Sequence, residues 1–290
     1  MPISISFTWL RGPLTVTLAL LLGACAHEVA GGGRERVVLK QGNVQVDVIA
    51  EGRGPAVVLL PSSQRDSEDY DDVARLIAAE GFRVLRPQPR GMHGSIGPME
   101  QLSLHDLAND VKLAVDRMGG GRAVLVGHAY GHFTARVADM DHPNMVRGVV
   151  VVGASEREIS QELIRKLNLA SDLTKPQDVR LKALQEVMFA PGNDASSWLT
   201  GWHPKVRDAY RGAAQRPGRD VWWPITNAPI LDLQGDSDPW RPASSRNELK
   251  DKLGSKITVK VIPRASHALM PEQPKAVALA IVEWVRTLQP

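Results

Sequence analysis

The chain has 290 residues, 43% of them hydrophobic and 23% charged, which is the composition of an ordinary globular protein. Its length allows one large domain with its own core, or two small ones. The 35 basic and 32 acidic residues give a net charge of +3 and are mixed along the chain, so we expect no nucleic-acid-binding surface.

Residues 1–24 have the pattern of a secretory signal. They contain one basic residue, Arg11, no acidic residue, and an apolar run over 14–22. This run is about half as long as the roughly 20 residues that a membrane-spanning helix needs. The segment ends in Leu22-Gly23-Ala24-Cys25, which resembles the lipobox of bacterial lipoproteins.

The resemblance implies that Cys25, the only cysteine, becomes a lipid-bearing mature N-terminus that anchors the protein to a membrane. Ala26 directly after it favours the outer membrane, with the protein facing the periplasm. The alternative is a plain signal peptide with an incidental cysteine. A single cysteine excludes any disulfide within the chain. Residues 25–35 include three consecutive glycines at 31–33 and predict a flexible tether.

From residue 36 onward, predicted strands alternate with predicted helices. The runs at 56–60 and 123–126 are continuously apolar, as expected of strands buried on both faces. The other predicted strands cover 36–39, 44–50, 82–85, 148–152, 230–233 and 257–262. The predicted helices cover 68–80, 104–118, 130–141, 244–253 and 274–288. This alternation indicates an α/β fold with a mostly parallel central sheet flanked by helices.

The pattern changes between residues 156 and 227. This segment has helical stretches but no buried strand, and it contains four of the seven tryptophans: Trp198, Trp202, Trp222 and Trp223. We expect a helical cap over the carboxyl edge of the sheet, inserted into a core made of residues 36–155 and 228–290. The four rings either line an apolar pocket under the cap or hold the helices of the cap together.

Three turns, each after a predicted strand, contain residue types of hydrolytic catalysis. They are Gly127-His128-Ala129-Tyr130-Gly131, the turn from Gly235 to Asp238, and the turn that ends in His267. In this order they resemble the nucleophile elbow, the acid and the histidine of the α/β-hydrolase superfamily, with alanine in place of the nucleophilic serine. At the elbow, a side chain on either glycine would collide with the neighbouring strand or helix.

The resemblance covers nearly all of residues 36–288 and includes the loop from Arg90 to Ser95, similar to the R-G-x-G-x-S loop of these proteins. It implies an α/β-hydrolase fold, with Ala129 at the nucleophile position, Asp238 as the acid and His267 as the base. By position, it also implies that the backbone N–H groups of Ser63 and Tyr130 form the oxyanion hole.

Alanine at the elbow has no hydroxyl, so an acyl-enzyme on Ala129 is impossible and ordinary serine esterase chemistry is excluded. Three explanations remain: an introduced inactivating substitution, a non-catalytic ligand-binding lipoprotein, or a dyad without a covalent step. We favour the dyad, in which His267, oriented by Asp238, acts as general base on a small, largely apolar molecule in the capped pocket. Ser62, Ser63 and Ser95 could supply a substitute nucleophile, but each is typical of a turn.

No metal site or cofactor is expected. His128 and His132 are four residues apart, but no cysteine or carboxylate cluster accompanies them. The expected partners are a small-molecule substrate or ligand and, through the lipid on Cys25, a membrane. The oligomeric state is not indicated.

Overall fold

The structure is a computed structural model that describes residues 1–4, 33–155 and 159–289. By its contacts the chain divides into residues 1–30 and one compact unit, 31–290. The predicted signal segment, apart from its first four residues, and the predicted lipidation site Cys25 lie outside the described residues. Among the described residues, no helix has the length and apolar character needed to span a bilayer.

The described strands form one eight-stranded sheet in the order β1-β2-β4-β3-β5-β6-β7-β8. The hairpin of β1 and β2 is antiparallel, and β2 is antiparallel to β4; every other neighbouring pair is parallel. The prediction of a mostly parallel sheet is therefore confirmed. The strands are β1 Glu35–Gln41, β2 Val44–Glu51, β3 Ala56–Leu60, β4 Arg83–Pro87, β5 Ala123–His128, β6 Val146–Val152, β7 Ile230–Gly235 and β8 Ile257–Ile262.

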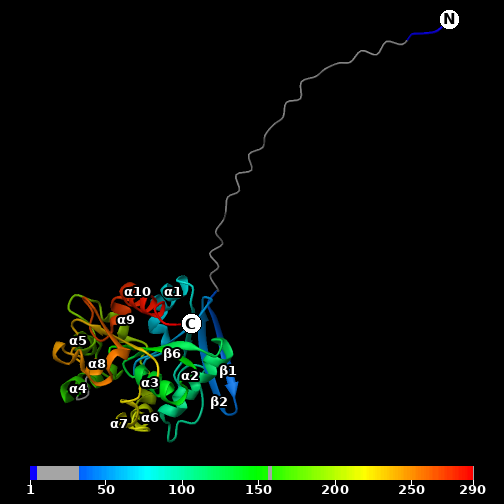
Figure 1. Cartoon of the computed structure of the whole chain (residues 1–290). Helices are drawn as coiled ribbons and strands as arrows, with labels where there is room; N and C mark the ends of the chain where they lie inside the picture. The colour runs from blue at the N-terminus through cyan, green and yellow to red at the C-terminus, as the bar shows by residue number, and fades with distance from the viewer. Residues whose placement is uncertain (5–32, 156–158, 290) are drawn as a thin grey trace. The chain divides into compact units, whose positions relative to one another are not determined.

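The helices that follow these strands cover both faces of the sheet (Figure 1). Sequence patterns locate several ends correctly: α2 starts after Ser103, whose side chain accepts the Asp106 N–H while Asp106 accepts the Ser103 N–H. The α-helices are α1 Asp71–Ala79, α2 Leu104–Met118, α3 Gly131–Asp141, α4 Gln161–Ser171, α5 Gln177–Val187, α6 Arg207–Ala213, α7 Arg219–Trp222, α8 Glu248–Leu253, α9 Leu269–Glu272 and α10 Pro274–Val285.

Two predicted helices begin differently in the structure. The helix predicted over 68–80 starts as a 3-10 turn, Ser67–Tyr70, before α1, because the Asp66 side chain accepts the Glu68 N–H and caps that turn. The helix predicted over 244–253 is α-helical only over Glu248–Leu253, after a 3-10 turn at Ala243–Ser245.

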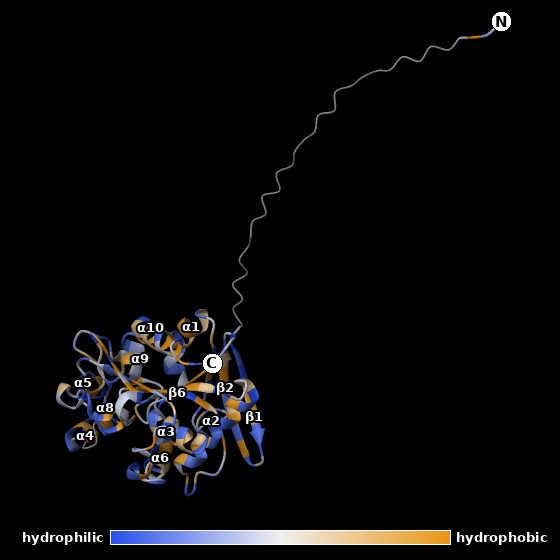
Figure 2. Cartoon of the chain, in the orientation of Figure 1, coloured by the Kyte–Doolittle hydropathy of each residue, from blue (hydrophilic) through white to orange (hydrophobic). Residues whose placement is uncertain are grey.

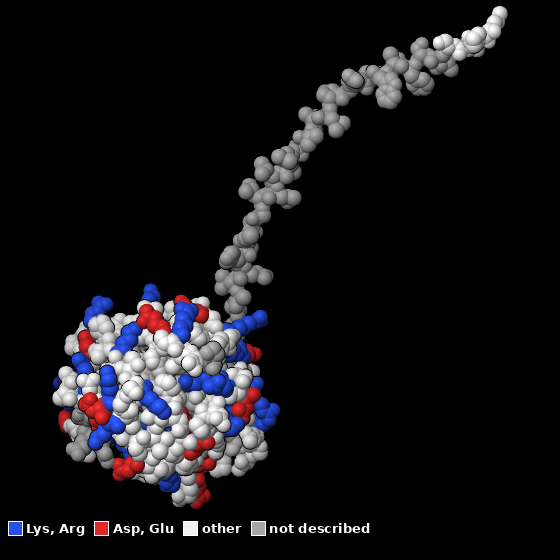
Figure 3. Space-filling view, viewed as in Figure 1, with Lys and Arg blue, Asp and Glu red and all other residues white. Residues whose placement is uncertain are grey.

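Side-chain alternation along the central strands divides the core between the two faces of the sheet. Val57 and Leu59 of β3 pack in an apolar cluster with α1 and α10, whereas Val58 and Leu60 pack in a second cluster with α2 and α3. Figure 2 shows hydrophobic colour on strands in the middle of the molecule, such as β6, and a mixture of hydrophobic and hydrophilic colour on the helices around them. On the face seen in Figure 3, basic and acidic side chains are interspersed.

The segment between β6 and β7 contains α4, α5, α6 and α7. It contributes most of a third apolar cluster, which also includes Trp240 and Ala268 from the loops after β7 and β8. The end of α5 is hydrogen-bonded to these loops: Trp240 Nε1 donates to the Val187 carbonyl at 2.6 Å, and the Ala268 N–H donates to the Met188 carbonyl at 2.7 Å. The helical insertion is thus attached to the carboxyl edge of the sheet.

Candidate active site

The turn between β5 and α3 places Ala129 in a left-handed backbone conformation, with φ of 45°. Its N–H donates to the Val152 carbonyl at 2.9 Å. A Cβ on Gly127 would overlap the backbone of His132 in α3, and a Cβ on Gly131 would overlap the Leu60 carbonyl in β3. The steric reason predicted for both glycines is confirmed.

The loops after β7 and β8 bring Asp238 and His267 together. His267 Nδ1 lies 3.0 Å from Asp238 Oδ2, and both side chains are buried. The other carboxylate oxygen of Asp238 accepts the Trp240 N–H at 2.8 Å, and the Trp240 ring lies 5.1 Å from the His267 ring, centroid to centroid. Since the carboxylate can only accept, Nδ1 donates to it and Nε2 presents a lone pair.

A cavity of about 160 Å³ lies between these loops and the elbow. Ala129 and His267 both line it, together with Ile159, Leu167 and Met188 from the insertion. Its walls are mainly apolar, and the His267 imidazole is a polar group on them. The cavity therefore joins the elbow and the Asp238–His267 pair in one site.

Ser63 and Tyr130, predicted as oxyanion-hole residues, also line this cavity. Among the described residues, neither backbone N–H has a hydrogen-bond acceptor, so both remain able to bind an oxygen atom. Ser62 lines the cavity too, whereas the Ser95 hydroxyl is used in the fold, donating to the Gln88 carbonyl at 2.8 Å. No described serine hydroxyl hydrogen-bonds to His267.

The four tryptophans expected at the pocket do not line this cavity; Trp240, which sequence reasoning missed, does. Arg65 contacts both Trp198 and Trp202: its Cζ is 4.6 Å and 4.8 Å from the two ring centroids, and the two rings meet edge to face with their centroids 6.1 Å apart. The cation–π contacts and the burial of these rings favour packing between the insertion and the loop after β3 over exposure to a ligand.

The remaining pair, Trp222 and Trp223, is buried beside Arg136 of α3, whose Cζ lies 5.8 Å and 5.7 Å from their ring centroids. These rings therefore attach α7 to the core. The expectation that the tryptophans line the pocket is corrected for all four, because each fills space between the insertion and the body of the fold.

His128 and Tyr70 connect the loop after β3 with the loop that carries His267. The sequence did not indicate this role for either residue. His128 Nε2 lies 2.7 Å from the His267 carbonyl, which only accepts, so Nε2 carries the proton and Nδ1 accepts from the Tyr70 hydroxyl at 2.8 Å. The same hydroxyl accepts the Ser62 N–H at 3.1 Å. Burial lowers the pKa of His128 to about 3, so the ring is neutral at physiological pH.

The fold, the three turns at its carboxyl edge and the Asp238–His267 pair are all typical of one protein family. The model of the alpha/beta hydrolase family matches residues 57–280. The chain belongs to this family. Epoxide hydrolase A of Mycobacterium tuberculosis is 23% identical over 322 residues, covering 89% of this chain and 99% of that protein. A fluoroacetate dehalogenase from a Burkholderia species is 30% identical over 125 residues, but these cover only 41% of each chain.

Solved structures of other proteins share the fold of this chain. A thermophilic esterase from Thermogutta terrifontis matches with a TM-score of 0.71 and 20% identity, over 88% of this chain and 98% of the esterase. A bromoperoxidase from Bacillus anthracis matches with a TM-score of 0.70 and 17% identity, over 88% and 100% of the two chains. At these identities the likeness establishes the architecture of the α/β hydrolase and leaves its substrate open.

Proposed function

We propose that this α/β hydrolase acts on a small, largely apolar molecule without forming a covalent enzyme intermediate. In this proposal His267 is the general base, Asp238 orients it, and Ala129 stands where a hydrolase of this fold has its nucleophile. The observation that carries the proposal is the contact of 3.0 Å between His267 Nδ1 and Asp238 Oδ2, with the imidazole on the wall of the cavity that Ala129 also lines.

The chemistry proposed for an ester begins with water. His267 Nε2 takes a proton from a water molecule whose oxygen attacks the carbonyl carbon. The carbonyl electron pair becomes an oxyanion that accepts hydrogen bonds from the N–H groups of Ser63 and Tyr130. As the tetrahedral intermediate collapses, the bond to the leaving oxygen breaks and the imidazolium returns its proton to that oxygen. One water is consumed, and an acid and an alcohol leave.

The cavity supports a small substrate. Its volume of about 160 Å³ is close to that of cavities of roughly 150 Å³ that bind benzene. Leu167, Met188 and Trp240 give it apolar walls. A bound molecule would therefore bury hydrocarbon against them and present its reacting bond to His267.

The proposal is tested with a panel of small apolar esters and lactones. We expect His267→Ala to lower turnover by about 10²-fold or more, the usual contribution of a general base. Intact-mass measurement during turnover should show no acyl adduct on the wild type. His105→Ala is the control, because His105 is an exposed histidine that contacts a carboxylate, that of Asp141, away from the cavity. Undiminished turnover by His267→Ala would contradict the proposal.

Ala129→Ser separates the dyad from the ligand-binding alternative. The variant places a hydroxyl in the cavity at the nucleophile position. In a serine hydrolase, removing the hydroxyl of the catalytic serine lowers kcat about 10⁶-fold. We expect this variant to acquire an acyl adduct and a fluorophosphonate label that the wild type lacks. Activity in the variant alone would indicate that the wild type is a disabled hydrolase. If neither form turns over any compound, a ligand-binding protein becomes the better description.

We also propose that Cys25 is lipidated and that the protein faces the periplasm from the outer membrane. The support is the sequence Leu22-Gly23-Ala24-Cys25, followed by Ala26. Growth with an alkyne-labelled fatty acid should label the wild type and leave Cys25→Ser unlabelled. Label on the Cys25→Ser protein, or none on either protein, would contradict lipidation at this residue.

A further inference from the structure

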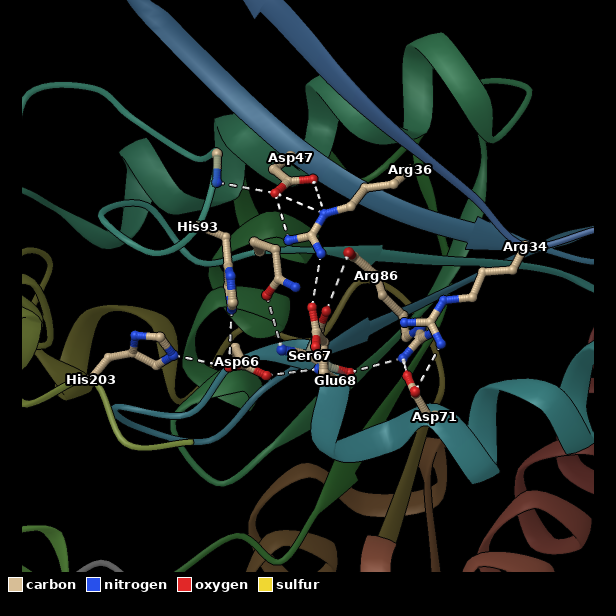
Figure 4. Close-up of polar contacts among 12 residues, drawn as sticks. Arg34, Arg36, Asp47, Asp66, Ser67, Glu68, Asp71, Arg86, His93 and His203 are labelled. Atoms are coloured by element: carbon tan, nitrogen blue, oxygen red, sulfur yellow. Dashed lines mark hydrogen bonds and ion pairs between the residues drawn. The ribbon is translucent and has the colours of Figure 1, made fainter. Parts of the chain in front are cut away.

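Two histidines and one aspartate form a cluster, with both imidazoles pointing at the carboxylate (Figure 4). Asp66 follows β3, His93 lies in the loop after β4, and His203 belongs to the insertion between β6 and β7. His93 Nε2 is 3.0 Å from Asp66 Oδ2, and His203 Nε2 is 2.9 Å from the same oxygen. None of the three residues lines the cavity beside Ala129.

Two imidazole nitrogens and a carboxylate oxygen are a donor set that divalent transition metals bind. The three potential ligand atoms all lie within 4.8 Å of one another. In a tetrahedral zinc site, with bonds of about 2.0–2.1 Å, ligand atoms are roughly 3.3 Å apart. The Asp66 oxygen is therefore a few tenths of an ångström too close to each imidazole nitrogen. The two imidazole nitrogens lie within 4.8 Å of each other, so rotations of the two rings toward each other and away from the carboxylate would admit an ion.

The surroundings hold the carboxylate in the orientation that a metal ligand needs. Asp66 Oδ1 accepts the Glu68 N–H at 2.9 Å, which leaves Oδ2 directed at the two imidazoles. The His203 N–H donates to the Gln64 carbonyl at 2.9 Å and so fixes the insertion beside this loop. Backbone contacts thus hold two of the three residues, Asp66 and His203, in place, as in a preorganised site.

Exposure of the cluster leaves room for a water ligand. The Asp66 side chain is 10% exposed, while those of His93 and His203 are 30% and 27% exposed. The carboxylate is therefore enclosed and the imidazoles reach solvent on one side. An ion bound by the three residues would retain an open coordination position on that side.

We propose that Asp66, His93 and His203 bind a divalent transition metal ion of the Zn²⁺ type and that the ion clamps the insertion to the loops after β3 and β4. This clamp is independent of the chemistry proposed for His267. The proposal departs from the expectation of no metal site. The sequence did not indicate one, because Asp66 is 27 positions from His93 and 137 from His203. Local spacing along the chain contains no trace of such a site.

The test uses the full chain, purified without a polyhistidine tag and stripped of metal with a chelator. Titration with Zn²⁺ against a chromophoric chelator should show uptake of one equivalent. Co²⁺ should give the visible absorption of a low-symmetry site with nitrogen and oxygen ligands. His93→Gln and His203→Gln should each weaken binding by more than about tenfold and lose the Co²⁺ spectrum. In the wild type alone, the melting temperature should rise with Zn²⁺ concentration.

Two controls isolate the cluster. His105→Gln removes a histidine that contacts one carboxylate, that of Asp141, at 2.6 Å and belongs to no three-residue group among the described residues, so it should bind metal as the wild type does. Cys25→Ser removes the lone thiol and should also leave binding unchanged. Less than one equivalent bound by the wild type would overturn the proposal. So would affinities for His93→Gln and His203→Gln that equal the wild-type affinity.

Discussion

Replacing Tyr70 by Phe should destabilise the α/β hydrolase and disturb its active site together. The Tyr70 hydroxyl accepts the Ser62 N–H at 3.1 Å and donates to His128 Nδ1 at 2.8 Å. His128 Nε2 in turn donates to the His267 carbonyl at 2.7 Å. The phenol therefore connects the loop that follows β3, next to Ser63, with the loop that holds the proposed base.

The size of the effect follows from what the substitution leaves behind. Tyr70 and His128 are both 0% exposed, so water cannot replace the lost hydroxyl without rearrangement. The Ser62 N–H and His128 Nδ1 would each lose a partner, at about 1–3 kcal/mol per buried group, or roughly 2–6 kcal/mol together. At about 2–4 °C per kcal/mol for a domain of this size, the melting temperature should fall by at least about 4 °C.

Thermal unfolding followed by circular dichroism measures this fall, and turnover of any substrate found reports on the site. Tyr210→Phe is the matched control, because the Tyr210 hydroxyl is also buried but donates only to the Arg90 carbonyl, at 2.9 Å. It leaves one buried group without this partner, so it should cost about 1–3 kcal/mol and leave turnover nearly unchanged. A melting temperature for Tyr70→Phe that is no lower than that for Tyr210→Phe would refute the bridging role of Tyr70.

Three further predictions concern stability. Burial lowers the pKa of His128 to about 3, so below pH 6.5 the unfolded chain gains a proton that the folded chain does not. As the pH falls from 6.5 to 3, the contribution of His128 to the unfolding free energy should fall by up to about 1.4 kcal/mol per pH unit. Urea unfolding of the wild type and of His128→Gln at several pH values measures this. If the unfolding free energy changed equally with pH in both proteins, the prediction would be contradicted. Gly131→Ala pushes a Cβ into a carbonyl of β3 and should lower the unfolding free energy by about 3 kcal/mol or more. Gly218→Ala is the control, because its Cβ would meet nothing closer than 4.0 Å. Equal urea midpoints for the two variants would be inconsistent with the close packing at the elbow. Arg65→Lys loses the paired hydrogen bonds to Asp69 and the contacts of the guanidinium with two tryptophan rings, and it should lower the melting temperature by several degrees. Scanning calorimetry measures this fall, and an unchanged melting temperature would contradict it.

Much of the fold was predictable from local patterns. The buried strands β3 and β5 appear as continuous apolar runs because both of their faces are covered by helices. The bounds of α2 follow from the capping residue Ser103 and from Gly119 at its end. Gly127 and Gly131 were predictable for a steric reason, because a strand that turns sharply into a helix leaves no room for a side chain at either position.

Contacts between distant segments were decided by the tertiary structure alone. Tyr70 and His128 are 58 positions apart, and Asp66 is 137 positions from His203. Nothing in the periodicity of either segment indicates which loops the folded sheet brings to the same edge. The packing partners of Trp198 and Trp222 were likewise decided by the tertiary structure. Composition shows that a large aromatic ring will be buried, but it does not show which residues the ring will pack against. The amino-acid sequence by itself therefore determined the layers, the turns and the absence of a hydroxyl at Ala129. Packing at the carboxyl edge of the sheet decided which side chains surround that alanine, because those neighbours come from loops that meet only when the whole sheet has formed.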